Sequence, residues 1–177
     1  MLLVLIFDKT FLLRYIGEYC DNKIKNRLGR AVKLSTKGRY AVRAMLDLAV
    51  QSGDSPTLIK DISARQQISC LYLEQLFTRL KTAGLVRSVR GPRGGFILAR
   101  PPREIRFIDI VQVMEGSMAP VECVDNALLC SRADSCVARR VWTEVKEAVD
   151  GVLSGITLED LVERQRRNGV EDHKQKV

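Results

Sequence analysis

The 177-residue sequence contains a single histidine, His173. It also lacks a glycine-rich phosphate loop and a recognisable pair of carboxylates, so it offers no general-base or nucleophile constellation of an enzyme. No apolar run approaches the length of a bilayer span. The apolar stretch 2–7 is followed directly by Asp8 and Lys9, without a small-residue cleavage site, which is unlike an export signal. We therefore expect a cytoplasmic protein that is neither an enzyme nor a membrane protein.

The formal net charge of +8 is distributed unevenly along the chain. Residues 33–100 hold 12 Lys and Arg against 4 Asp and Glu, whereas residues 101–177 hold 11 against 14. A basic first part joined to a mildly acidic second part is typical of a nucleic-acid reader with an attached sensor or partner domain.

Three of the five cysteines lie in one short loop, in the pattern C-x6-C-x5-C formed by Cys123, Cys130 and Cys136. Thiols of a cytoplasmic protein stay reduced, so this grouping indicates a metal site rather than disulfides. Thiolates suit an iron–sulfur cluster, and they also suit zinc. A redox thiol switch and a loop without a ligand remain open as alternatives. Cys20 and Cys70 are expected to be bystanders, with Cys70 a small buried residue.

Apolar periodicity and capping residues predict a mainly α-helical chain with one β-hairpin. The expected helices span residues 36–51, 57–67, 70–83, 107–115, 137–153 and 157–166, and the expected strands span residues 85–89 and 95–98. Thr57 and Ser69 are expected to cap the second and third helices, and Thr157 to open the last one in a capping box with Asp160. Helix, turn, helix and hairpin follow in the order of a winged helix-turn-helix domain, whose helix before the hairpin enters the major groove of DNA.

The helix over residues 70–83 has two distinct faces. Its expected core face holds Leu73, Leu76, Phe77 and Leu80. On the opposite face, Gln75 can bond adenine in a bidentate way and Glu74 can accept a hydrogen bond from cytosine. Leu71 is apolar on this polar face, and it can touch a thymine methyl group or pack against the hairpin.

Basic residues surround this helix. Arg90 and Arg93 flank the tip of the hairpin, where an arginine can enter a narrow minor groove. Lys37, near the start of the first helix, is expected to neutralise a DNA phosphate.

Four segments resemble the IscR-type (Rrf-two) family of transcription regulators, namely Lys33–Met45, Ile68–Phe77, Val89–Gly95 and Ile156–Leu158. The resemblance covers residues 33–163. It implies a dimeric winged-helix protein that binds a double-stranded DNA operator. The DNA-binding residues then expected are Lys37, Ser69, Leu71, Tyr72, Glu74, Gln75, Arg90 and Arg93. Leu71 stands where relatives often have a serine, which implies a different operator preference.

The resemblance also implies that Cys123, Cys130 and Cys136 bind an iron–sulfur cluster, [2Fe–2S] or [4Fe–4S]. The fourth ligand is unknown. IscR has a histidine at the position of Arg139, and a guanidinium cannot serve as a ligand. The carboxylates of the same region, Glu122, Asp125 and Asp134, and an exogenous ligand all stay open.

We expect five segments: a non-essential extension over residues 1–32, the winged-helix domain over 33–115, the cysteine loop over 116–136, a dimerisation helix and final helix over 137–167, and a polar tail over 168–177. The extension is inferred from Val32, which stands where family members begin. Dimerisation is inferred from an apolar stripe of Val137, Val141, Val145, Ala148, Val149 and Val152, next to Trp142.

The sequence thus predicts a sequence-specific, homodimeric repressor that senses iron–sulfur cluster, redox or iron status through three cysteines. The alternatives are a cluster-free regulator that responds to a partner protein or to thiol oxidation, and a zinc or redox protein.

Overall fold

The computed structural model describes residues 34–51, 55–91 and 94–174, which all belong to one compact unit, Leu34–Val177. The extension expected over residues 1–32 lies outside the described residues. Within them, no helix has the length and apolar character needed to cross a lipid bilayer.

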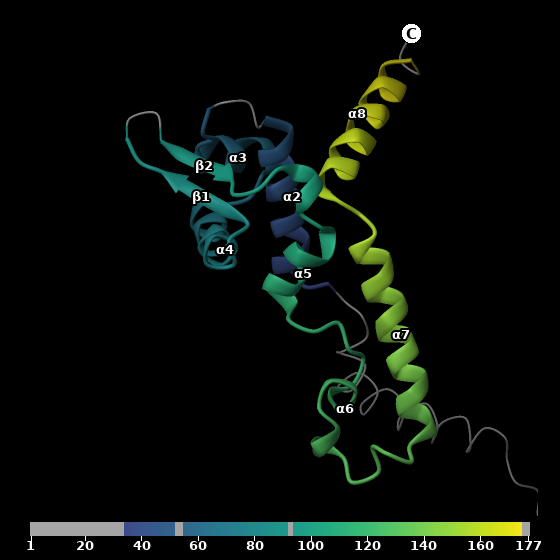
Figure 1. Cartoon of the computed structure of the whole chain (residues 1–177). Coiled ribbons are helices and arrows are strands. Elements are labelled where there is room, and N and C mark those ends of the chain that lie inside the picture. Colours follow the sequence, from purple (N-terminus) through teal and green to yellow (C-terminus); the bar gives the residue numbers. More distant parts are fainter. Residues whose placement is uncertain (1–33, 52–54, 92–93, 175–177) are drawn as a thin grey trace, which may run out of the picture. The chain divides into compact units, whose positions relative to one another are not determined.

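The first half of the unit is a winged helix-turn-helix (Figure 1). Its elements are α2 (Thr36–Gln51), α3 (Ile59–Gln66), α4 (Cys70–Thr82), β1 (Val86–Val89) and β2 (Gly95–Leu98). The expected fold class, mainly α with a β-hairpin wing, is therefore confirmed.

The two strands of the wing pair antiparallel, from Val86 opposite Leu98 to Val89 opposite Gly95. Thr57 lies beside β2 and forms an isolated antiparallel β-bridge with Phe96, since the two residues exchange backbone hydrogen bonds of 2.9 and 2.8 Å. The expectation that Thr57 caps α3 is therefore wrong: Leu58 stands at the cap, without a side-chain bond, because the Thr57 backbone is held in the sheet. A β-carbon at Gly95 would overlap the Thr57 carbonyl, so this close approach requires glycine.

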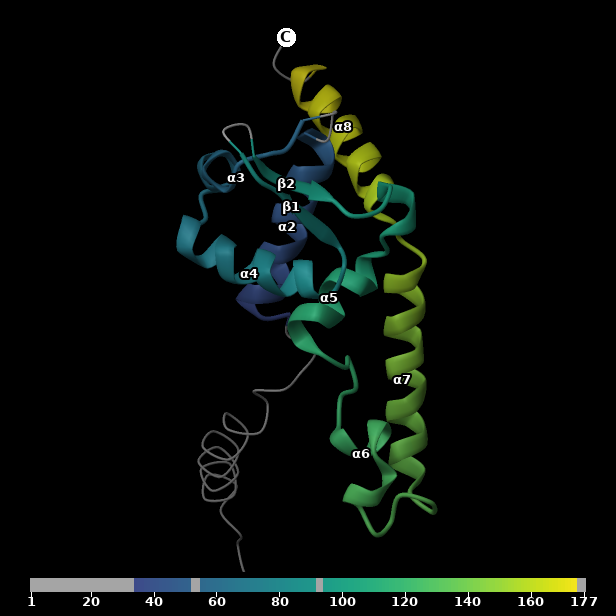
Figure 2. The same ribbon diagram turned by 60° about the vertical axis from the view of Figure 1, so that its left-hand side comes forward.

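The second half contains η2 (Pro102–Glu104), α5 (Phe107–Glu115), α6 (Glu122–Asp125), η3 (Ala127–Leu129), α7 (Val137–Ser154) and α8 (Leu158–Lys174). Helix α7 begins beside α6 and runs past α5 toward the winged-helix part, and α8 follows it and lies against α2 (Figure 2). No residue of α7 is buried.

One hydrophobic core joins both halves. Its buried residues come from α2, α3, α4, β1, α5 and α8, and they include Met45, Leu48, Ile62, Leu73, Phe77, Leu80, Val86, Ile110, Leu158 and Val162. Helix α8 is fixed where it begins, because Leu158 donates a 2.8 Å hydrogen bond to the Ile105 carbonyl and Asp160 caps the Thr157 amide at 2.8 Å. The expected capping box is thus present, while the helix itself extends beyond the expected end, to Lys174.

Candidate DNA interface and cysteine loop

Helix α4 has the two faces expected from the sequence. Its four expected core residues are all buried, with exposed fractions of at most 2%. Ser69 caps the helix, since its hydroxyl oxygen accepts a 3.4 Å hydrogen bond from the Tyr72 amide. On the other face Leu71, Glu74 and Gln75 are exposed.

A chain of aromatic and basic contacts fixes the start of α4 to α2. The Tyr72 ring meets the Tyr40 ring edge to face, with centroids 5.9 Å apart, and the Arg43 guanidinium lies 5.5 Å from the centre of the Tyr40 ring. Arg43 also donates hydrogen bonds to the Gln66 side chain and carbonyl. Tyr72 is therefore half-buried between α4 and α2, and Arg43 connects α2 to α3.

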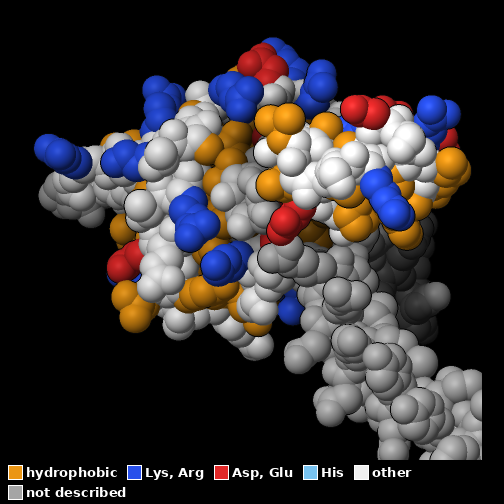
Figure 3. Space-filling view, turned by 90° about the horizontal axis from the view of Figure 1, so that it is seen from below, with side chains coloured by type: hydrophobic (Ala, Val, Ile, Leu, Met, Phe, Trp, Pro, Cys, Tyr) orange, Lys and Arg blue, Asp and Glu red, His pale blue; other side chains and the backbone are white. Residues whose placement is uncertain are grey.

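Exposed basic side chains lie on two elements near α4. Lys37 and Arg39 are exposed in the first turns of α2, and Arg90 is exposed after β1. Arg93 lies outside the described residues. Seen from below, Lys and Arg side chains are spread over the winged-helix part with apolar side chains between them (Figure 3).

The first turn of α2, which carries Lys37, is capped by two residues. The Ser35 hydroxyl oxygen accepts a 3.1 Å hydrogen bond from the Lys37 amide. Glu115, the last residue of α5, accepts hydrogen bonds from the Ser35 amide (3.0 Å), the Ser35 hydroxyl (2.7 Å) and the Gly38 amide (3.1 Å). The sequence carried no signal for Glu115, which lies 80 residues away from Ser35.

The three loop cysteines lie in or directly beside helical elements. Cys123 lies in α6, Cys130 directly follows η3, and Cys136 is the residue before α7. All three are free and half-exposed. Among the described residues, no three His, Cys, Asp or Glu side chains converge closely enough to hold one metal ion.

Arg139 holds this loop together. Its Nε atom donates a 2.7 Å hydrogen bond to the Cys123 carbonyl, and its Nη1 atom donates one of 3.4 Å to the carbonyl of buried Ala133. The side chain at the position of the IscR histidine therefore binds backbone oxygens on both sides of Cys130. The carboxylates Glu122, Asp125 and Asp134 are exposed in the same segment.

Two further expectations concern cysteine and valine side chains. Cys70 is exposed rather than buried, because the first turn of α4 extends beyond the core that covers Leu73 and Phe77.

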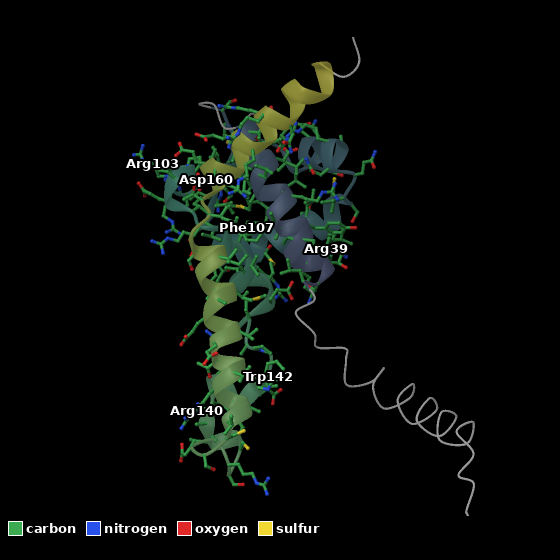
Figure 4. The ribbon with its side chains drawn as sticks, turned by 90° about the vertical axis from the view of Figure 1, so that its right-hand side faces the viewer. Arg39, Arg103, Phe107, Arg140, Trp142 and Asp160 are labelled. Atoms are coloured by element: carbon green, nitrogen blue, oxygen red, sulfur yellow. The ribbon has the colours of Figure 1, made fainter. Side chains whose placement is uncertain are left out.

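The valine stripe expected on α7 is exposed: Val137, Val141 and Val152 rank among the exposed large apolar residues. Trp142 is 41% exposed. Figure 4 shows Trp142 and Arg140 on different sides of α7.

Comparisons with known proteins agree with this architecture. Residues 34–164 match the Rrf2 family, described as iron-dependent transcriptional regulators. The transcriptional regulator IscR of Photorhabdus laumondii is 42% identical over 134 residues, which cover 76% of this chain and 81% of IscR.

Two solved structures are similar to the chain. One is IscR of T. potens, with 45% identity and a TM-score of 0.62, covering 75% of this chain and 88% of that one. The other is CymR, the global cysteine regulator of B. subtilis, with 41% identity and a TM-score of 0.63, covering 75% of this chain and 97% of that one. The IscR relative of Photorhabdus laumondii is a helix-turn-helix transcriptional regulator. The family expected from the sequence is confirmed: the chain belongs to the Rrf2 family and is an IscR-type, DNA-binding transcriptional regulator.

Proposed function

We propose that α4 reads the operator through Gln75 and Glu74, with Ser69, Leu71 and Tyr72 at its first turn. The observation that carries this assignment is the polar, exposed face of α4, opposite four buried residues of the core. In the major groove, adenine presents N7 and its N6 amino group, which a glutamine such as Gln75 can bond together. Cytosine presents its N4 amino group there, which the carboxylate of Glu74 can accept from.

Lys37 contacts phosphate in this proposal, and Arg90 and Arg93 of the wing reach the backbone or the minor groove. These contacts release counterions, so operator affinity falls steeply as salt increases. We further propose that the chain acts as a repressor, by occupying promoter DNA that RNA polymerase would otherwise bind.

Footprinting and binding titrations with the selected operator test the reading helix. Gln75→Ala lowers affinity by about 1–3 kcal/mol and relaxes the preference at one base pair. The matched control is Gln112→Ala, which removes an exposed glutamine from α5. An unchanged base preference in the Gln75→Ala, Glu74→Ala double variant would remove α4 from the interface.

We also propose that Cys123, Cys130 and Cys136 bind an iron–sulfur cluster. Three free thiols within one loop fit this group chemically, and the loop consists of short elements that can bring the sulfur atoms together. When bound, the cluster supplies a group that responds to oxygen and iron supply. The chain supplies the three thiolates, and the Arg139 guanidinium positions the backbone on both sides of Cys130.

Anaerobic reconstitution tests the cysteine assignment. The wild-type chain takes up iron and sulfide in equal amounts, and its operator affinity changes with loading. Cys130→Ala abolishes both, whereas Cys70→Ala, the control outside the loop, retains cluster uptake. Reconstitution without stoichiometric iron and sulfide would reject the cluster.

The stripe on α7 is proposed to pair with the same stripe of a second copy. Val137, Val141 and Val152 expose apolar surface along one long helix, and such surface is normally covered by a partner. An isologous pairing of α7 helices gives a two-fold dimer, which matches a palindromic operator. Val141→Glu shifts sedimentation toward the monomer, and an unchanged sedimentation coefficient contradicts this pairing.

A cluster-free thiol regulator is the alternative. It is favoured by the likeness to CymR of Staphylococcus aureus, for which an oxidised form has been solved (38% identity, TM-score 0.59, covering 74% of this chain and 96% of that one). In that case peroxide, rather than iron loss, changes operator affinity, and mass spectrometry detects an oxidised Cys123, Cys130 or Cys136.

A further inference from the structure

Leu71 is an unusual residue for its position. It is 69% exposed, whereas Leu73, Leu76 and Leu80 of the same helix are at most 2% exposed. A leucine that packed against the wing would lose most of its accessible surface, so the exposure of Leu71 excludes the hairpin as its partner. A large apolar side chain therefore projects from the reading helix into the space that DNA occupies in the proposed function.

The neighbours of Leu71 place it beside the bases. Residues three and four positions apart share a helix face, so Leu71 lies next to Glu74 and Gln75, which are both exposed. It stands in the first turn of α4, two residues after the Ser69 cap, and the first turn of a recognition helix is the part that contacts base edges. Tyr72 turns away toward Tyr40, which leaves Leu71 as the large exposed side chain of this turn, next to the small exposed Cys70.

We propose that Leu71 recognises the C5-methyl group of a thymine in the major groove, close to the base pair that Gln75 reads. Thymine alone among the four bases presents a methyl group there. A leucine cannot bond the cytosine amino group, and covering that group costs free energy because it loses its water. Leu71 therefore selects thymine by attraction and disfavours cytosine by desolvation.

The spacing of the helix limits where this thymine lies. Four residues of α-helix rise about 6 Å, and successive base pairs are about 3.4 Å apart. The thymine recognised by Leu71 is thus within about two base pairs of the adenine bonded by Gln75. This inference rests on the proposed role of α4, and it adds a second base to the operator.

Deoxyuridine provides the test, because it removes only the methyl group and retains the hydrogen-bonding edge of thymine. Each thymine of the selected operator is replaced singly by deoxyuridine, and the affinity of the full chain is measured. At one position near the Gln75 contact, the substitution weakens wild-type binding about three- to fivefold, as the loss of one buried methyl group predicts. The Leu71→Ser variant should bind the thymine duplex and the deoxyuridine duplex with equal affinity.

The matched control is Leu128→Ser, which makes the same substitution at a leucine that is 94% exposed outside α4. It retains the wild-type ratio between thymine and deoxyuridine. Wild-type binding that ignores deoxyuridine at every position would overturn the inference, as would a Leu71→Ser variant that still discriminates the two duplexes. The inference is also overturned if Leu71→Ser changes only the oligomeric state of the chain, because Leu71 would then contact another protein subunit and not DNA.

Failure of this inference can be told apart from failure of the proposed reading helix. If Gln75→Ala relaxes its base pair while deoxyuridine has no effect, α4 still reads the operator and only the role of Leu71 is wrong. If neither Gln75→Ala nor Leu71→Ser changes any base preference, the assignment of α4 fails as well.

Discussion

Removal of the Glu115 side chain tests how the unit holds the start of α2. In Glu115→Ala, the amides of Ser35 and Gly38 and the Ser35 hydroxyl lose their common acceptor, which they contact at 3.0, 3.1 and 2.7 Å. All three bonds are partly buried, so water replaces the carboxylate only in part. Loss of a helix cap costs about 0.5–2 kcal/mol, and a second amide left without its charged acceptor adds about 1 kcal/mol.

We therefore expect Glu115→Ala to lower the free energy of unfolding by about 2 kcal/mol. For a unit of this size, that change corresponds to a fall in melting temperature of about 4–8 °C, measured by scanning calorimetry. Glu115→Gln retains an acceptor oxygen without its charge and should lose about half as much. Gly38→Ala should resemble Glu115→Ala, because its methyl group would occupy the position of the Glu115 carboxylate.

The control is Glu163→Ala, which removes an exposed glutamate from α8 and should leave the melting temperature unchanged. Equal melting temperatures for Glu115→Ala and Glu163→Ala would refute the reasoning. If Gly38→Ala leaves the melting temperature unchanged, the Glu115 carboxylate can move from its position without loss of stability.

Three other perturbations have defined outcomes. Hydrogen bonds from the Thr157 amide and hydroxyl lower the pKa of Asp160, so the ionised carboxylate stabilises the fold. This stabilisation is lost as pH falls from about 5 toward 3. In acid unfolding, Asp160→Asn should therefore lose less stability over that pH range than the wild-type chain. Asp47→Ala removes a buried carboxylate that accepts hydrogen bonds from Arg65 (2.6 Å) and Gln66, and should lower the free energy of unfolding by about 2 kcal/mol in urea titrations. An unchanged urea midpoint would make this ion pair dispensable. A chain without residues 1–31 should keep its melting temperature and operator affinity, and a loss of either would make the extension structural.

The sequence predicted those parts of the fold that depend on local patterns. The two faces of α4, the Ser69 cap and the Thr157–Asp160 box are all encoded within a few neighbouring residues. The wing was predictable too, since turn residues separate two short apolar strands. The exposed position of Cys70 was missed, because apolar periodicity does not show where the core ends along a helix.

Features that depend on contacts between distant elements could not be predicted. Glu115 reaches the start of α2 across 80 residues, and nothing near it in the sequence marks it as a cap. Arg139 was interpreted only as a residue unable to bind metal, whereas it donates to two carbonyls of the cysteine loop. Threonine is common at helix caps, but the backbone of Thr57 pairs with Phe96 and so belongs to the sheet.

The burial of Leu158 has a consequence for synthesis on the ribosome. Leu158 is fully buried and Val162 nearly so, and both pack into the core formed by α2 and α4. Helix α4 is translated long before these residues, so the nascent chain carries α4 on an unfinished core until α8 emerges. A ribosome that stops within the cysteine loop releases a chain that cannot close this core. A chain that ends before Leu158 therefore lacks two of the side chains that complete this core.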